Sequence, residues 1–396
     1  MEIKTSLGKM LSTGDKPRDV RIDAMRVFAM LFIVMHHLVT NVIPFSSMQN
    51  GVDFGALDRY LTVALWDGFW VIGVNVFFAA SGFCSMTLKP RKMISLLVKV
   101  YVYWLVGMLL QWAVAPDTYQ SVLSFLWQFI IAIARYWFVL VYMLLMLLAP
   151  VLNKFAEYLA AKSSRVGYFV FISTLFFCIV GFISDNIYPY MGTDKGYTVI
   201  WAAVPYLYGR LIRLKQDRLR SSVGFWALVY VAATLLNFAM ATALICTDNG
   251  GWAVHCYTYN NPLVLVSSLA FMLMFVSASP TESPRFYRLL SLVATHTLGV
   301  YLVHSNNPFL HRRRAFLMDM VGPLWAKFLL LPVNAMLLLV IGVLVDILYE
   351  WLLGRPVAKM AQCVEKGILF VYNKGMDALR RSATNKKATP PPEGED

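Results

Sequence analysis

Apolar residues gather into long runs along this chain. Most runs are about 20 residues long, which is the length that an α-helix needs to cross a hydrocarbon layer of about 30 Å. The pattern predicts ten transmembrane helices, at 24–44, 64–88, 93–114, 136–153, 166–184, 197–214, 223–246, 262–279, 291–310 and 324–348. One further apolar stretch, 121–134, is too short to span, and we expect it to lie in the outer interface or to re-enter the membrane.

The composition agrees with this pattern. Hydrophobic residues make up 59% of the 396 residues and charged residues only 14%, whereas about 25% of the residues of a soluble globular protein are charged. We therefore expect an all-α polytopic membrane protein. Its domain prediction is a cytoplasmic N-terminal segment 1–20, a transmembrane domain 21–353, and a cytoplasmic tail 354–396 that is disordered at its Pro-rich, charged end. Residues 1–20 lack a signal-peptide pattern, so the first span is expected to remain as an anchor.

The positive charge is distributed unevenly along the chain. If the N-terminus is cytoplasmic, the segments on its side carry 26 of the 35 Lys and Arg residues. Cytoplasmic loops are typically enriched in Lys and Arg, so this bias predicts that both termini are cytoplasmic. No basic run alternates with aromatic residues as a nucleic-acid surface would. The net charge of +13 therefore predicts contact with membrane lipids and no nucleic-acid partner.

The cysteines give little chemistry. Five cysteines form no C-x-x-C pair and no cluster with histidine, so we expect no metal site. Cys246 and Cys256 flank an expected outer loop, and the sequence leaves open whether they form a disulfide.

The first apolar run, RIDAMRVFAMLFIVMHH, carries polar residues into the membrane. Arg26 and His37 lie 11 residues apart, about three helical turns, so they share one face about 16 Å apart, and His36 points about 80° away from that face. Asp23 precedes Arg26 by one turn and can hold its guanidinium. Charged groups at such depth normally face a bundle interior or a water-filled cavity. The alternative is that Arg26 only anchors the topology and the histidines only pack between helices.

A second histidine lies at the same expected depth. His304 stands in the ninth predicted span, in THTLGVYLVHS. His37 lies 14 residues past Asp23, and His304 lies 13 past Ser291, which places both imidazoles about 20 Å from the inner edge. The two can therefore meet. Histidine takes and gives protons near neutral pH, as general acid–base catalysis requires.

Several separated motifs resemble those of the integral-membrane acyltransferase-3 family of polysaccharide and envelope O-acyltransferases. The resemblance extends from Arg21 to about the tenth span. It rests on a first-helix pattern, an FF-x-x-SG pattern, a WF…P pattern and a YL-x-H pattern, carried by Asp23, Arg26 and His37, by Phe77, Phe78, Ser81 and Gly82, by Trp137, Phe138 and Pro150, and by Tyr301, Leu302 and His304.

Two of the family's motifs are altered in this chain. Members often carry Arg-x-x-Arg in the third helix, linked to the acyl-CoA, where this chain has Leu96 and Lys99. Arg91 and Lys92 lie one to two turns away, and they either replace the missing cation or are ordinary charges of a cytoplasmic loop. Asn75 stands where many members have an acid before FF.

The resemblance implies an O-acyltransferase that moves an acyl group, most often acetyl among relatives, from cytoplasmic acyl-CoA to a hydroxyl of a cell-surface or lipid-linked glycan. Acyl-CoA is then a co-substrate, with no permanently bound cofactor, and the protein is a multi-pass protein of a prokaryotic cytoplasmic membrane. The implied catalytic residues are His37, Arg26, Asp23 and His304. The implied donor-binding residues are Arg26, Lys99, Arg91, Lys92 and Ser81, and the implied acceptor-binding residues are Trp137, Arg312, Arg313 and Arg314.

Other functions stay open at this stage. A proton-coupled transporter of a glycan or small metabolite would also need buried Arg and His residues, although transporters commonly show internal repeats and none is evident here. The three arginines could instead contact anionic lipid headgroups. The sequence leaves open the acyl group, the acceptor, an acyl-histidine intermediate and the oligomeric state.

Overall fold

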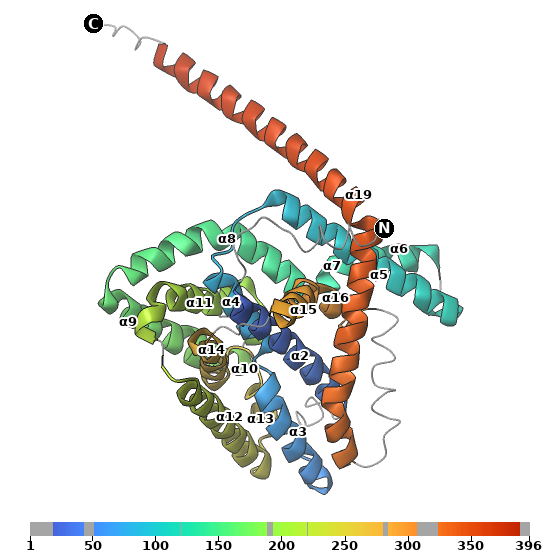
Figure 1. Ribbon diagram of the computed structural model, residues 1–396, viewed down its shortest axis with the longest axis vertical. Coiled ribbons are helices and arrows are strands. Elements are labelled where there is room, and N and C mark those ends of the chain that lie inside the picture. Colours follow the sequence, from blue (N-terminus) through green and yellow to red (C-terminus); the bar gives the residue numbers. More distant parts are fainter. Residues whose placement is uncertain are drawn as a thin grey trace, which may run out of the picture. The chain divides into compact units, whose positions relative to one another are not determined.

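Helices are the regular secondary structure of the described residues in a computed structural model of the protein (Figure 1). The structure describes residues 19–42, 51–119, 121–187, 193–219, 221–279, 284–305, 307 and 324–388. The elements in chain order are α2 (Val20–Val42), η2 (Phe54–Ala56), α3 (Leu57–Trp70), α4 (Gly73–Phe83), α5 (Pro90–Val114), η3 (Pro116–Thr118), α6 (Val122–Ile130), α7 (Ala132–Arg135), α8 (Trp137–Ala160), α9 (Ser163–Ile172), η4 (Ser173–Val180), α10 (Gly181–Ile187), η5 (Asp194–Gly196), α11 (Val199–Leu219), α12 (Val223–Cys246), α13 (Gly250–His255), α14 (Pro262–Ser277), α15 (Pro284–Thr295), α16 (Thr297–His304) and α19 (Leu324–Ala388).

Seven helical segments within the described residues are long and apolar enough to cross a membrane. They coincide with seven of the ten predicted spans and run over Val20–Thr40, Phe54–Phe83, Pro90–Val114, Trp137–Ala160, Ser163–Ser184, Val223–Cys246 and Phe328–Val371. The all-α prediction is thus confirmed. The count of ten and the cytoplasmic position of the termini stay predictions.

The other three predicted spans are also helical but differ from a simple spanning helix. The predicted span 197–214 lies in α11, whose last two turns carry several charged residues. The predicted span 262–279 is the 16-residue helix α14, shorter than a full crossing. The predicted span 291–310 overlaps α15 and α16, which are bent by 46° at a break and together make an eighth candidate span. The stretch 121–134 forms the short helices α6 and α7.

Apolar side chains face outward and polar ones inward on α12. Leu228 and Leu236 are 67% and 59% exposed, whereas Thr234 and Asn237 are buried. The Asn237 side chain donates to the Cys256 carbonyl at 3.0 Å, so its polar group is satisfied inside the protein. This distribution fits a helix surrounded by lipid, where each buried polar group needs a partner.

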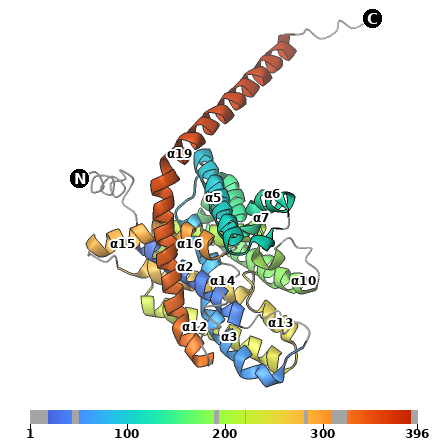
Figure 2. The same cartoon turned by 90° about the vertical axis from the view of Figure 1, so that its right-hand side faces the viewer.

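The chain divides into two compact units, and the larger one, residues 1–88 and 100–347, contains the candidate site. Within it, α2 packs against α3, α4, α14, α15 and α16. Figure 2 shows α15 and α16 beside α2. Helix α2 therefore has protein neighbours on several sides, which allows its polar residues to lie inside the protein.

Helices α4 and α11 approach closely at two glycines. A β-carbon on Gly82 would lie 1.8 Å from the Tyr206 carbonyl oxygen, and one on Gly209 would lie 1.9 Å from the Ala79 carbonyl oxygen. Only glycine fits at such a crossing. The Ser81-Gly82 pair predicted from the sequence thus has a packing role through its glycine.

The smaller unit comprises residues 89–99 and 348–396. Lys99 on α5 is buried there and pairs with Glu350 of α19, with 3.0 Å between Nζ and Oε1. The Lys99 ammonium also lies 4.8 Å from the centre of the Tyr349 ring. Helix α19 continues through residues 354–388 of the expected cytoplasmic tail, and residues 389–396 lie outside the described part of the chain.

Candidate active site

His37 and His304 meet inside the larger unit, as the sequence predicts. His37 comes from the last third of α2 and His304 is the last residue of α16. Their Nδ1 and Nε2 atoms lie 3.1 Å apart, and their ring centres are 5.2 Å apart. Two residues separated by most of the chain thus form one hydrogen-bonded pair within a membrane-embedded helix cluster.

The partners of His304 fix which nitrogens carry protons. Its Nδ1 lies 2.6 Å from the Val300 carbonyl oxygen, which can only accept, so Nδ1 of His304 is the donor. A neutral His304 then has its lone pair on Nε2 and accepts from the Nδ1–H of His37. In a neutral His37, Nε2 is consequently the basic nitrogen.

Aromatic contacts hold α16 at this position. The buried Tyr136 donates its hydroxyl to the Leu302 carbonyl at 3.0 Å. The Tyr301 ring packs edge-on against Tyr136 and His304. The Tyr-Leu-x-His motif therefore places Tyr301 as a packing partner of the histidine that follows it.

His36 lies on a different side of α2 and has a partner that the sequence analysis missed. Its Nδ1 lies 2.6 Å from Oδ1 of Asp67 on α3. Asp67 is 0% exposed, whereas the His36 side chain is 15% exposed. The signal for Asp67 was available, because an aspartate inside an apolar run such as LTVALWDGFW is rarely tolerated in a membrane without a partner.

Asp23 has a partner on another helix that the sequence did not predict. The buried Asp23 carboxylate accepts a 2.6 Å hydrogen bond from the Ser291 hydroxyl of α15. The sequence prediction considered only residues of the same helix, whereas α15 also packs against α2. Asp23 thus joins α2 to α15, and Arg26 is left half-buried without an ion pair among the described residues.

Arg26 belongs to a set of charges around Cys84, at the end of α4. Burial raises the pKa of the Cys84 thiol, the positive charges of Arg26 and Arg213 lower it, and the negative charges of Asp23 and Asp19 raise it. Arg213 comes from α11. Its guanidinium lies 5.1 Å from the centre of the ring of Phe83, the last residue of α4, and donates to Gln216 at 3.3 Å.

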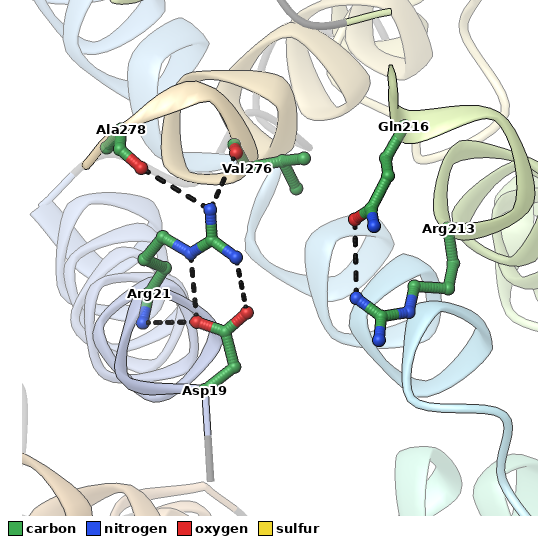
Figure 3. A network of polar contacts seen from close by, with 6 residues as sticks. All are labelled: Asp19, Arg21, Arg213, Gln216, Val276 and Ala278. Carbon is green, nitrogen blue, oxygen red and sulfur yellow. Dashed lines mark hydrogen bonds and ion pairs between the residues drawn. The ribbon is translucent and has the colours of Figure 1, made fainter. Parts of the chain in front are cut away.

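A second arginine ties the start of α2 to the end of α14, as Figure 3 shows. Arg21 donates to the carbonyls of Val276 and Ala278 at 3.0 and 3.4 Å and pairs with Asp19 at 2.7 Å. Burial raises the pKa of the Asp19 carboxyl, but hydrogen bonds from Arg21 and the charge of Arg21 lower it more, so that this pKa is below its usual value. Helix C-termini favour such cations.

The remaining predicted donor residues belong to both compact units. Lys99 is engaged with Glu350, while Arg91 and Lys92 are exposed near the start of α5, all within the smaller unit. The Ser81 hydroxyl donates to the Phe77 carbonyl of its own helix at 2.9 Å. A serine that bonds back to its own turn is an ordinary feature of a membrane helix.

Trp137 stands in an aromatic cluster at the start of α8. Its ring centre lies 4.6 Å from that of Tyr197 and 5.9 Å from that of Tyr259. Tyr197 is 41% exposed. The neighbouring Phe138 packs against Tyr301 at 5.5 Å, so aromatic side chains connect the exposed Tyr197 to the helix that carries His304. The other predicted acceptor residues, Arg312, Arg313 and Arg314, lie outside the described residues.

A second buried histidine–aspartate pair was also missed. Asp346 of α19 accepts from the Tyr103 hydroxyl at 2.5 Å and lies 2.7 Å from His296 Nδ1 at the break between α15 and α16. A β-carbon on Gly299 would lie 2.3 Å from the Asp346 carboxyl, so the glycine allows this close approach.

The described residues contain no metal-binding cluster of three or more His, Cys, Asp or Glu. Cys246 and Cys256 are both free thiols, so the disulfide left open by the sequence is not formed. Cys256 is buried, and burial raises the pKa of its thiol to about 12.

Comparison with known proteins gives a match over most of the chain. The acyltransferase-3 family model, described as an acyltransferase domain, matches residues 19–351. This range includes α2, α16 and all the described residues of the site. The search of curated proteins and the search of solved structures gave no significant match.

Proposed function

The chain belongs to the acyltransferase-3 family, and we propose that this membrane acyltransferase moves an acyl group from cytoplasmic acyl-CoA to a hydroxyl of a cell-surface or lipid-linked glycan. The acyl group we propose is acetyl, and the membrane is a prokaryotic cytoplasmic membrane. The observation that carries the proposal is the hydrogen-bonded sequence His37, His304 and Val300 carbonyl. It supplies an oriented imidazole inside a membrane domain.

His37 acts as the general base. Its Nε2 takes the proton of the acceptor hydroxyl while the hydroxyl oxygen attacks the thioester carbonyl carbon. His304 positions His37, because its Nε2 can accept only from the Nδ1 side of the His37 ring. This keeps the basic nitrogen directed away from the pair. Exclusion of bulk water favours transfer to the acceptor over hydrolysis.

Arg26 and Arg213 are the proposed contacts for the acyl-CoA phosphates. The charges of both act on the Cys84 thiol that follows α4, although Arg26 comes from α2 and Arg213 from α11. Guanidinium groups bind phosphate through paired, charge-assisted hydrogen bonds. Arg213 thus offers a second cation in place of the arginine pair that the third helix lacks. Arg91 and Lys92 remain proposed donor contacts on the smaller unit.

Trp137 is the proposed platform for the acceptor. With the exposed Tyr197 it offers aromatic faces that can pack against the C–H face of a sugar ring, and the buried Tyr259 packs behind both rings. The contacts from Trp137 to Phe138 and from Phe138 to Tyr301 support an acceptor position near His304. Arg312, Arg313 and Arg314 stay proposed contacts for a phosphate or acidic sugar of the acceptor.

Mass analysis of surface glycans tests this function. Cells that produce the protein should carry ester-linked acetyl groups that a deletion strain lacks, and His37→Ala should fail to restore them at equal membrane abundance. Trp137→Ala should reduce them, whereas Trp127→Ala, on the exposed surface of α6, serves as the matched control and should restore them fully. Identical glycans in the deletion and complemented strains would refute the proposed acceptor class.

A further inference from the structure

The His36–Asp67 pair lies next to the proposed base and is not used by it. The ring centres of His36 and His37 are 5.6 Å apart. Asp67 is fully buried, and its Oδ1 forms a hydrogen bond with Nδ1 of His36. Its Oδ2 is buried and has no hydrogen-bond partner in the described part of the chain.

This environment determines the proton state of His36. A buried carboxylate with one hydrogen bond is costly unless an opposite charge lies beside it. An imidazolium at His36 supplies that charge, and it then also carries a proton on Nε2. His37 differs, because its Nδ1 faces the imidazole of His304 and not a carboxylate. Two adjacent imidazoles thus stand in environments that favour opposite proton states, which is how acid and base roles are divided between neighbouring groups.

We propose that His36, held by Asp67, is the general acid that protonates the leaving thiolate, while His37 is the base. Asp67 is a positioning residue that keeps His36 charged and correctly oriented. This inference rests on the proposed acyl transfer and assigns a role that the His37–His304 pair does not fill.

The proton and bond changes balance. The acceptor O–H proton goes to His37 Nε2 as the new C–O bond forms. The C–S bond breaks, its electron pair stays on sulfur, and the thiolate takes the Nε2 proton of His36. The products are the ester and the free thiol, with His36 neutral and His37 protonated. Transfer of that proton from His37 to His36 restores both residues.

Leaving-group dependence separates this role from a structural one. The full-length protein in lipid nanodiscs is given acetyl-CoA, S-ethyl thioacetate or S-phenyl thioacetate with a glycan extract of the source cells, and thiol release is measured. Thiophenol is a far more acidic thiol than ethanethiol or CoA and needs no proton to leave. His36→Gln keeps a donor toward Asp67 but cannot give a proton. We expect it to lose about 100-fold in rate with acetyl-CoA and S-ethyl thioacetate and less than about 3-fold with S-phenyl thioacetate.

Asp67→Asn should show the same dependence on the leaving group with a smaller loss of rate. It replaces His36→Gln in the experiment if that variant does not insert into the membrane. His296→Gln is the matched control, because it alters a buried pair of similar geometry. Any loss there should be equal for all three thioesters. Equal losses for the three thioesters in His36→Gln, or no loss with acetyl-CoA, would overturn the acid role. If the wild-type protein releases no thiol from any donor, the acyltransferase proposal itself fails.

Discussion

Two buried histidine–aspartate pairs in the larger unit have similar contacts but different surroundings. His36 lies 2.6 Å from Asp67, and His296 lies 2.7 Å from Asp346. Asp346 has both carboxyl oxygens occupied, because Tyr103 donates to Oδ1 while His296 contacts Oδ2. Asp67 leaves Oδ2 without a partner among the described residues.

The difference indicates which pair is built for packing and which for chemistry. A fully satisfied carboxylate at the break between α15 and α16 has the properties of a structural tie. The Asp67 carboxylate, near the His37–His304 pair, has one oxygen without a hydrogen bond among the described residues. A positive charge on His36 stabilises such a buried carboxylate. Residue type and distance alone would not distinguish the two pairs.

The largest effect is expected at His37. His37→Ala should lower acyl transfer by about 10,000-fold, because the base is lost, which is well beyond the loss of about 100-fold expected when only the acid at His36 is removed. His36→Ala should keep measurable transfer, because thiolate departure is slowed but the hydroxyl is still activated. Rates are compared at equal protein abundance in nanodiscs. Equal loss in both variants would mean that the separation of roles between adjacent histidines is wrong.

Asp346→Ala should mainly reduce stability. It leaves His296 and Tyr103 without their shared acceptor inside the protein, and breaking such a buried pair costs about 3–5 kcal/mol. Thermal unfolding in detergent measures the loss, with Asp58→Ala on the exposed start of α3 as control. A variant that unfolds like wild type but transfers no acyl group would place this second pair in the catalytic machinery.

A smaller effect is expected at Arg26, a proposed contact for the acyl-CoA phosphates. Arg26→Lys keeps the charge but loses the planar fork, so acyl-CoA affinity should fall by about tenfold. A binding titration measures it, and Arg59→Lys, an exposed arginine of α3, should bind as wild type does. Unchanged affinity and turnover in Arg26→Lys would reduce Arg26 to a topology anchor.

The smallest effect concerns Asp19. Its pKa is lowered in the folded protein by Arg21 despite burial, so the contact adds stability above the pKa of a free aspartate, about 3.9, and this contribution is lost as the pH falls through the lower folded-state value. Asp19→Asn should therefore be less stable than wild type at neutral pH, with the gap closing in acid. A gap that widens in acid would contradict this sign.

The sequence predicted the features that depend on local pattern. Helical periodicity placed His37 and His304 at equal depth, and their contact follows. It did not find Ser291, the partner of Asp23 on a different helix, and it missed Asp67 and Asp346 as partners of histidines. These contacts depend on which helices pack together and in what rotation, and composition or spacing within one segment does not determine either.

The most direct test of the central claim uses purified full-length protein in nanodiscs, with radiolabelled acetyl-CoA as donor and the glycan extract as acceptor. Label should appear in the glycan as an alkali-labile ester with the wild-type protein. It should be absent with His37→Ala and present with His296→Gln. Label transfer by His37→Ala at the wild-type rate would contradict the proposal that the His37 imidazole activates the acceptor hydroxyl.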